Sequence, residues 1–297
     1  MKYTAQKLRT PVGLAGLAAA VALSSGCTTA DSGAAPSQTP GSPAAGVPLP
    51  AEAAHVHGVD VDPATGDVLV ATHSGLVRVS APDSTADGGA SVERVGPAID
   101  LMGFAVAEPG RLVASGHPGP GVDLPDPVGL VESRDGGQSW EPLSRAGESD
   151  FHALAATPDR VIGFDGRLRA TEDGVTWTEL DSAVEPFSLA VSDDGATVVA
   201  TTPRGPMRSD DGGESFAPVA DSPPLLLVDW APGTDSVYGV SADGRIHRSD
   251  DGGTTWTATG EVGGEPQALH ADADQLVVAA DHHVTRSTDG GATFGAW

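Results

Sequence analysis

The sequence predicts an all-β protein that folds as a six-bladed β-propeller, with a seven-bladed ring as the alternative. Two observations lead to this prediction. A short motif recurs at intervals of about forty residues, which indicates an array of similar supersecondary units. Each interval also contains four segments with the patterning of short strands, and four-stranded units repeated around an axis form the blades of a propeller.

The recurring motif reads Ser/Thr-x-Asp-x-Gly-x-Thr/Ser-aromatic. It is matched at Ser133–Trp140, Ser209–Phe216, Ser249–Trp256 and Ser287–Phe294, and Thr85–Val92 and Ala170–Trp177 are degenerate copies. The Asp can accept hydrogen bonds from the backbone of the turn that follows it, and the Gly supplies a positive φ that a residue with a Cβ resists. We expect a hairpin turn in each copy, held by its acidic residue. These residues are Asp87, Asp135, Glu172, Asp211, Asp251 and Asp289.

Each unit is expected to open with two strands before the pair that flanks the motif. The first strands are expected at Val56–Val61, Leu101–Val106, Phe151–Ala155, Phe187–Val191, Leu226–Trp230 and Gln267–Ala271. The second strands are expected at Val68–Thr72, Leu112–Ser115, Val161–Phe164, Thr197–Thr201, Ser236–Val240 and Leu276–Ala280. A seventh blade would have to lie in the longer second unit. The stretch His117–Val128 reads as a proline-rich loop instead, which favours six blades.

The N-terminal region has the features of a secretory signal. Residues 1–26 contain three basic residues, no acid and the apolar run Val12–Leu23, which is short for a spanning helix. The run ends in Leu23-Ser-Ser-Gly-Cys27, which resembles a bacterial lipobox with its Leu one position early. Because Cys27 is the single cysteine, we expect it to carry a lipid anchor on the outer face of the bacterial cytoplasmic membrane. The alternative is a secreted protein with a free thiol.

The following residues, 27–54, are rich in Ala, Pro and Ser and are expected to form a disordered tether. The propeller is then expected to span residues 55–297. The whole chain has a formal charge of −25, and removing residues 1–26 moves it to about −28, because three basic residues are lost. Such a surface repels nucleic acid and anionic lipid, so membrane contact is expected only through the lipid. A monomer that binds a glycan or an envelope protein fits this composition.

The repeated motif resembles the Asp-box, or BNR repeat, of sialidases and sortilin-type receptors, over roughly residues 55–297. The resemblance implies a propeller whose motif copies lie away from the active face. It does not imply a true sialidase, because the Phe/Tyr-Arg-Ile-Pro signature is absent and Tyr238 is the only tyrosine after the signal. The arginines that directly precede motif copies are expected on outer strands, where they would form no substrate-binding triad. These are Arg169, Arg208, Arg248 and Arg286.

The layout as a whole resembles actinobacterial lipoproteins described as glycosylhydrolase-like. It combines a lipobox, a Pro/Ala tether, a His-x-His-Gly opening at His55 and the motif copies. That description concerns the fold, so the chemistry has to be argued from individual residues.

Polar residues gather where the first strands would line the channel. One equivalent position holds His55, Asp100, Asp150, Glu185, Leu225 and Glu265, and two residues further lie His57, Met102, His152, Phe187, Leu227 and Gln267. The period of two places both rings on the same face of their strands. His73, His117 and Asp165 follow the second strands of the first three units.

Three explanations for these residues remain open. The first is a Cu or Zn site formed by His55, His57, Met102, His117 and His152. The second is an acid/base pair for glycoside cleavage, with Asp100, Asp150, Glu185 and Glu265 as the candidates. The third is a set of polar residues that line a water-filled channel. The expected function is a lipid-anchored binding or scaffolding module. The alternative is an exo-acting glycoside hydrolase, which the small number of aromatic residues disfavours.

Overall fold

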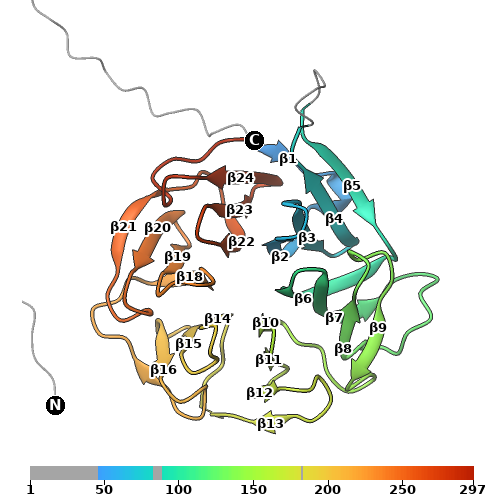
Figure 1. The fold of residues 1–297 in the computed structure, drawn as a ribbon, viewed down its shortest axis with the longest axis horizontal. Helices are drawn as coiled ribbons and strands as arrows, with labels where there is room; N and C mark the ends of the chain where they lie inside the picture. The colour runs from blue at the N-terminus through green and yellow to red at the C-terminus, as the bar shows by residue number, and fades with distance from the viewer. Residues whose placement is uncertain (1–45, 83–88, 182) are drawn as a thin grey trace, which may run out of the picture. The chain divides into compact units, whose positions relative to one another are not determined.

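The computed structural model describes residues 46–82, 89–181 and 183–297, and in these ranges the protein is nearly all β. The chain forms six antiparallel four-stranded sheets. They are arranged in a ring about a central axis, as Figure 1 shows. The predicted six-bladed propeller is therefore confirmed. Within the described ranges no helix is long and apolar enough to cross a membrane.

The blades follow one another along the chain. Blade 1 contains β2 (Val56–Val61), β3 (Val68–Thr72), β4 (Gly75–Ser80) and β5 (Ser91–Val95). Blade 2 contains β6 (Ile99–Glu108), β7 (Arg111–Pro118), β8 (Leu130–Ser133) and β9 (Glu141–Ser144). Blade 3 contains β10 (Ala153–Thr157), β11 (Arg160–Phe164), β12 (Leu168–Thr171) and β13 (Thr178–Glu179).

The second half repeats this order. Blade 4 contains β14 (Ser188–Val191), β15 (Val198–Thr201), β16 (Met207–Ser209) and β17 (Ala217–Pro218). Blade 5 contains β18 (Leu225–Trp230), β19 (Val237–Ser241), β20 (Arg245–Ser249) and β21 (Thr257–Glu261). Blade 6 contains β22 (Pro266–Ala271), β23 (Leu276–Ala280), β24 (His283–Ser287) and, from the start of the propeller, β1 (Val47–Pro48).

The N-terminal strand closes the ring. β1 pairs with β24, with Val47 opposite Val284, and Leu49 donates its N–H to the carbonyl of His282 at 2.8 Å. A short 3-10 helix, Ala51–Ala53, follows, and Ala53 is fully buried. The prediction that the propeller begins at His55 is therefore wrong, because residues 47–53, which were expected in the tether, belong to the fold. Residues 27–45 of the expected tether lie outside the described residues. A two-residue strand is too short to show a period, so its burial could not be read from the sequence.

The core lies between adjacent blades. Because each blade packs against a neighbour on both sides, its second strand is buried on both faces, as the continuous burial of β3, β15 and β23 shows. Larger side chains fill the outer part of the interface. Phe151, with no exposed surface, stacks on Trp177 with 4.7 Å between ring centroids.

The repeated motif forms the hairpin turn between the third and fourth strands, as predicted. Asp135 accepts the backbone N–H of Ser139 at 2.9 Å, and the Ser133 hydroxyl accepts the N–H of Gly137 at 2.8 Å. A Cβ on Gly137, whose φ is 88°, would lie 2.3 Å from Leu76 of blade 1. The same contacts recur around Asp211, Asp251 and Asp289. Asp87 lies outside the described residues.

In blade 3 the acid of the turn is Asp173, and the prediction of Glu172 is wrong. Asp173 accepts the N–H groups of Val175 and Thr176 at 2.8 and 2.6 Å, and the Thr171 hydroxyl donates to it at 3.0 Å. This copy is one residue shorter than the others, so an alignment on its closing Trp shifts the acid by one position.

Arginines on the third strands tie neighbouring blades together. Arg78 donates to the carbonyl of Gly136 at 3.0 Å, and Arg208 donates to the carbonyl of Gly252 at 2.6 Å. In each case a side chain of one blade reaches the motif turn of the next. Arg169 of β12 instead pairs with Asp165 and Glu179 of its own blade. The expectation that the arginines before the motif are structural agrees with these contacts.

Candidate functional site

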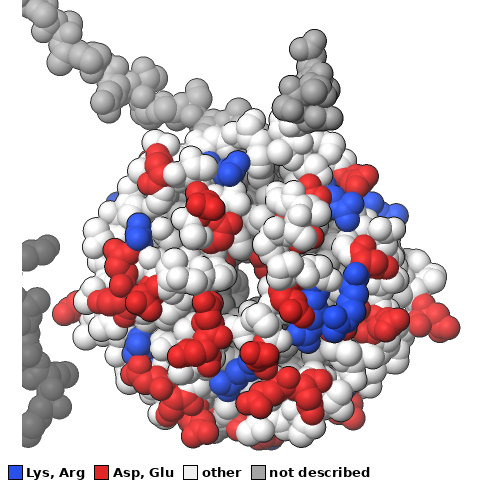
Figure 2. Space-filling model, viewed as in Figure 1, with Lys and Arg blue, Asp and Glu red and all other residues white. Residues whose placement is uncertain are grey.

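A cavity of about 1010 Å³ occupies the centre of the ring and is lined by the first strands of all six blades. Figure 2 shows its opening and the acidic side chains distributed over the surrounding face. The middle of the channel is apolar, with Ala105, Leu154, Ala155, Val228 and Leu269 on its wall. Polar groups gather in two places, one near the start and one near the end of the first strands.

A bulge interrupts the first strand at the same place in four blades. The register shifts between Val56 and Gly58, Leu101 and Gly103, Leu225 and Leu227, and Pro266 and Ala268. The residues at the bulges are His57, Met102, Leu226 and Gln267. The expected equivalence of Leu227 with His57 is thus wrong by one residue, because the three consecutive leucines 225–227 contain no polar residue that would fix the alignment. The bulge at His57 also breaks the expected period of two. Bulges re-aim side chains, and this one turns His57 to the channel mouth.

Three side chains converge at that mouth, and we call His57, His73 and Asp100 the mouth cluster. His57 comes from β2, His73 directly follows β3, and Asp100 lies on β6. The Nε2 atom of His57 lies 3.6 Å from Oδ1 of Asp100, and the Nδ1 atom of His73 lies 2.7 Å from its Oδ2. One nitrogen or oxygen atom from each residue lies within 4.8 Å of the others.

Two atoms of the mouth cluster are buried without a hydrogen-bond partner among the described residues. They are Nε2 of His57 and Oδ1 of Asp100. Burial lowers the pKa of His57, an effect that the Asp100 carboxylate opposes and that His73, His55 and His152 reinforce. His57 is therefore neutral at pH 7, and a neutral imidazole is the form that binds metal ions.

The other expected metal ligands do not join the mouth cluster. His152 and His117 both face Asp150, whose Oδ2 lies 3.3 and 3.1 Å from their Nε2 atoms. The Nδ1 atom of His117 lies 2.6 Å from Asp126, and this hydrogen bond raises the pKa of His117. His55 packs edge-to-face on His73 with 6.4 Å between centroids. Met102 lines the cavity. Of the five expected ligands, the structure places His57 alone among the converging atoms.

The four candidate catalytic carboxylates differ in their surroundings. Asp100 and Asp150 each face histidines, as described above. Glu185 and Glu265 are exposed, and their carboxylates form no hydrogen bond or ion pair with another described side chain.

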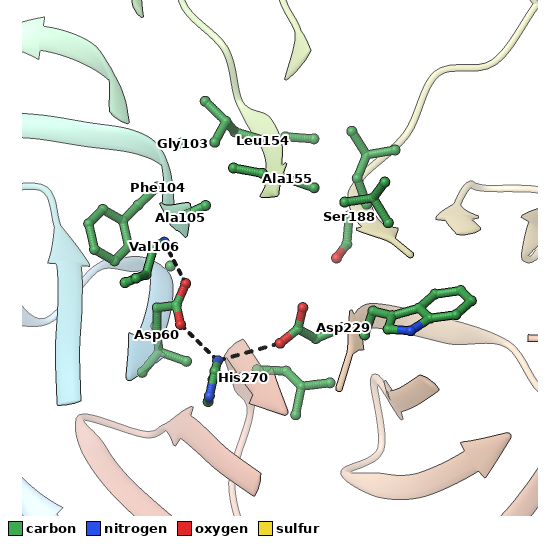
Figure 3. Close-up of a pocket in the computed structure, with 18 of the residues that line it drawn as sticks. Asp60, Gly103, Phe104, Ala105, Val106, Leu154, Ala155, Ser188, Asp229 and His270 are labelled. Atoms are coloured by element: carbon green, nitrogen blue, oxygen red, sulfur yellow. Dashed lines mark hydrogen bonds and ion pairs between the residues drawn. The ribbon is translucent and has the colours of Figure 1, made fainter. Parts of the chain in front are cut away.

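A second polar group, which the sequence analysis missed, lies deeper in the channel. We call Asp60, Asp229 and His270 the channel cluster (Figure 3). The Nδ1 atom of His270 lies 2.9 Å from Oδ1 of Asp60 and 3.6 Å from Oδ2 of Asp229. On its other side, Nε2 of His270 lies 3.4 Å from Asp272.

The charges of this cluster are coupled. Burial alone would lower the pKa of His270, but the carboxylates of Asp60, Asp272 and Asp229 raise it to about 10. Burial raises the pKa of Asp229 to about 7, with a further contribution from the charge of Asp60, while His270 opposes the rise. His270 is therefore an imidazolium at pH 7, and Asp229 is partly protonated.

The channel cluster also connects neighbouring blades through the backbone. Asp60 accepts the N–H of Val106 in blade 2 at 2.7 Å, and Asp229 accepts the N–H of Ala271 in blade 6 at 2.7 Å. The Ser188 hydroxyl of blade 4 accepts the N–H of Val228 in blade 5 at 3.1 Å. Asp60, Asp229 and His270 are each the fifth residue of a six-residue first strand. A titratable residue at the fifth position of three first strands is the signal that could have revealed them.

No protein-family model matches the chain, and no curated protein is similar to it. Solved propeller structures are similar in fold. A gluconolactonase from Xanthomonas campestris superimposes with a TM-score of 0.60 at 15% identity, covering 83% of this chain and 96% of the enzyme. A chain of a nidogen/laminin complex gives a TM-score of 0.56 at 14% identity, covering 75% and 89%.

A GH74 xyloglucanase, also from Xanthomonas campestris, gives a TM-score of 0.47 at 22% identity. The match covers 84% of this chain but 41% of the xyloglucanase, so the chain spans less than half of that enzyme. At these identities the likenesses show the propeller fold alone, and that fold serves enzymes and binding proteins alike.

Proposed function

We propose that this protein is an extracytoplasmic binding module, anchored by a lipid on Cys27, whose channel mouth binds a divalent transition-metal ion. His57, His73 and Asp100 would be the ligands. The observation that carries the proposal is the approach of one ligand atom from each of the three residues to within 4.8 Å of one another. Two atoms of these residues, Nε2 of His57 and Oδ1 of Asp100, are also buried without a hydrogen-bond partner among the described residues. A buried polar atom without a hydrogen bond costs about 1–3 kcal/mol, and a bound cation would offset that cost.

The chemistry of the three side chains fits zinc or copper. Imidazole nitrogens bind both metals well, and a carboxylate oxygen completes the set of ligands. Calcium and magnesium prefer sites made of oxygen ligands, so a site with two imidazoles does not favour them. Three protein ligands leave an open position on a zinc ion, to which a channel ligand can bind. The ion would supply Lewis acidity at that position. The protein's own residues would hold it, with Asp100 between the two imidazoles.

An exo-acting glycoside hydrolase finds less support. The neighbours named as a xyloglucanase and a gluconolactonase share the fold, but they assign no residue here. An acid/base mechanism needs two available carboxylates. Asp229, whose pKa is raised, could serve as the acid, and Asp60 is the carboxylate whose charge contributes to that rise. Both oxygens of Asp60 are already occupied, by the N–H groups of Val61 and Val106 and by His270.

Calorimetric titration of the purified protein with Zn²⁺ and Cu²⁺ tests the proposal. We expect one equivalent to bind. We expect His57→Ala and Asp100→Asn each to weaken binding by about a hundredfold, because loss of a residue that only supports a metal ligand already weakens binding by up to about a hundredfold. His283→Ala is the matched control, because His283 is an exposed imidazole on β24 of blade 6. Absence of binding, or equal affinity in all three variants, would contradict the metal site.

A further inference from the structure

One carboxylate oxygen of the channel cluster remains available to a ligand. Oδ2 of Asp229 accepts the N–H of Ala271 and faces His270. Its other oxygen points into the channel, as Figure 3 shows, and 30% of the Asp229 side chain is exposed there. No described side chain donates a hydrogen bond to that oxygen. The backbone N–H of Trp230 also donates a hydrogen bond to this carboxylate. Because each carboxylate oxygen has two lone pairs, the oxygen that faces the channel still offers an acceptor position at the wall of a cavity of about 1010 Å³.

The surroundings of this oxygen are apolar. Leu154, Ala155 and Val228 line the same cavity, and Phe187 lines it with 60% of its surface exposed. The nearby Ser188 hydroxyl is already bonded to the backbone of Val228. A hard metal ion needs several oxygen ligands, so a single available oxygen between apolar walls is not a suitable site for such an ion. It suits an organic ligand with a single polar group and an apolar body.

The charge balance indicates the sign of that polar group. Three carboxylates, those of Asp60, Asp229 and Asp272, surround one imidazolium, that of His270. The raised pKa of Asp229, caused first by burial and then by the charge of Asp60, means that a proton supplies part of the missing positive charge. A ligand cation can take the place of this proton. The formal charge of −25 further concentrates cations near the protein.

We propose that the channel binds a primary or secondary organic ammonium ion with an apolar body. The ammonium group donates to the oxygen of Asp229 that faces the channel, and the body lies along the wall formed by Leu154, Val228 and Phe187. Exposed Phe187 adds an aromatic surface for the apolar part. The ammonium ion would lie near a second cation, the imidazolium of His270. Binding therefore needs the negative charge of ionised Asp229. The proposal does not depend on a metal ion at the mouth cluster.

The test is calorimetric titration with phenethylamine at pH 8 in the presence of EDTA, with 2-phenylethanol as the uncharged probe of the same shape. We expect saturable binding of the amine and at least tenfold weaker binding of the alcohol. Asp229→Asn should weaken amine binding at least tenfold, since its amide keeps an acceptor for Ala271 but carries no charge. The matched control is Asp243→Asn, which removes an exposed carboxylate away from the cavity. Asp243→Asn should bind the amine like the unmodified protein.

Two measurements on the unmodified protein keep the proposal testable if Asp229→Asn does not fold. Lowering the pH from 8 to 5.5 should weaken amine binding roughly thirtyfold, because the ionised fraction of Asp229 falls to about 3%. Titrations at pH 7 in two buffers with different ionisation enthalpies should show that a fraction of a proton is released on binding. Equal binding of the alcohol, unchanged affinity in Asp229→Asn, no proton release, or no saturable amine binding would each overturn the proposal.

Discussion

The two polar clusters of the channel share strand β2 but satisfy their polar atoms in opposite ways. His57 and Asp60 are three residues apart on that strand, or about 10 Å along it. Asp60 receives two backbone N–H groups and an imidazolium. At the mouth, Nε2 of His57 and Oδ1 of Asp100 are buried without a partner. Asp60 thus has all its hydrogen bonds within the protein, whereas these two atoms of the mouth cluster have none.

The two histidines show the same difference. Carboxylates raise the pKa of His270, so the channel cluster contains its own cation. Burial lowers the pKa of His57, so at the mouth a neutral imidazole, that of His57, lies beside the Asp100 carboxylate. Groups of similar chemistry thus serve two purposes. The channel cluster holds blades 1, 2, 5 and 6 together around a cation of its own, His270, whereas the mouth cluster has no such internal cation.

The largest expected effect of a substitution follows from this contrast. Asp60→Ala removes the acceptor for Val106 and leaves the imidazolium of His270 with one carboxylate fewer, so we expect a loss of about 3–5 kcal/mol in the free energy of unfolding. His57→Ala should change it by less than about 1 kcal/mol, since no hydrogen bond of the imidazole Nε2 is lost. Urea denaturation of both variants measures the difference. Equal destabilisation would remove the distinction between the clusters.

The pH dependence of stability provides the second test. The folded-state pKa of His270, about 10, lies above its usual value of 6.5, so its contribution is complete below about pH 6.5 and is lost as the pH rises towards 10. The pKa of Asp229 is raised to about 7, so its contribution to the free energy of unfolding is lost as the pH rises from about 4 to about 7. We expect a loss of up to about 3 kcal/mol between pH 6.5 and 9.5.

Chemical denaturation at a series of pH values measures this loss. In His270→Gln the alkaline decrease should disappear, since the titrating imidazole is gone. A profile of that variant that still falls in parallel with the unmodified protein would assign the decrease to other groups.

The third prediction separates the histidines of the mouth. His73→Ala should weaken zinc binding by about ten- to a hundredfold, because Nδ1 of His73 belongs to the converging atoms. His152→Ala should change it less than about threefold, because His152 faces Asp150 instead. Competition with a fluorescent zinc indicator gives both affinities. The reverse order would place the ion at Asp150.

The smallest effects are expected for Glu185→Gln and Glu265→Gln. Both side chains are exposed, so neither substitution should change the free energy of unfolding by more than about 0.5 kcal/mol, nor the affinity for zinc or phenethylamine. Thermal melting and the two titrations check this. A loss of ligand binding in either variant would restore these acids to the candidate site.

The repeated turns made the blades predictable from the sequence, because Asp, Gly and hydroxyl residues at fixed spacing leave a local pattern. The closing strand left none, since Val47–Pro48 is held by contacts with residues some 235 positions away in the chain, such as Val284. The alignment of β18 was wrong by one residue because the leucines 225–227 contain no polar residue that would fix it, and the bulge at His57 breaks the period of two expected in β2. The convergence of His57, His73 and Asp100 depends on how blades 1 and 2 pack against each other. The periodicity within a single strand gives no information about that packing.

The measurement that tests the metal site most directly is a long-range ¹H–¹⁵N spectrum of the histidine side chains during titration with Zn²⁺. One equivalent should shift the imidazole nitrogens of His57 and His73 and leave those of His270 in place, because the carboxylates and the proton of His270 already complete its surroundings. Shifts at His270 or at the exposed His283, or an unchanged spectrum, would contradict the assignment of the mouth cluster as the cation site.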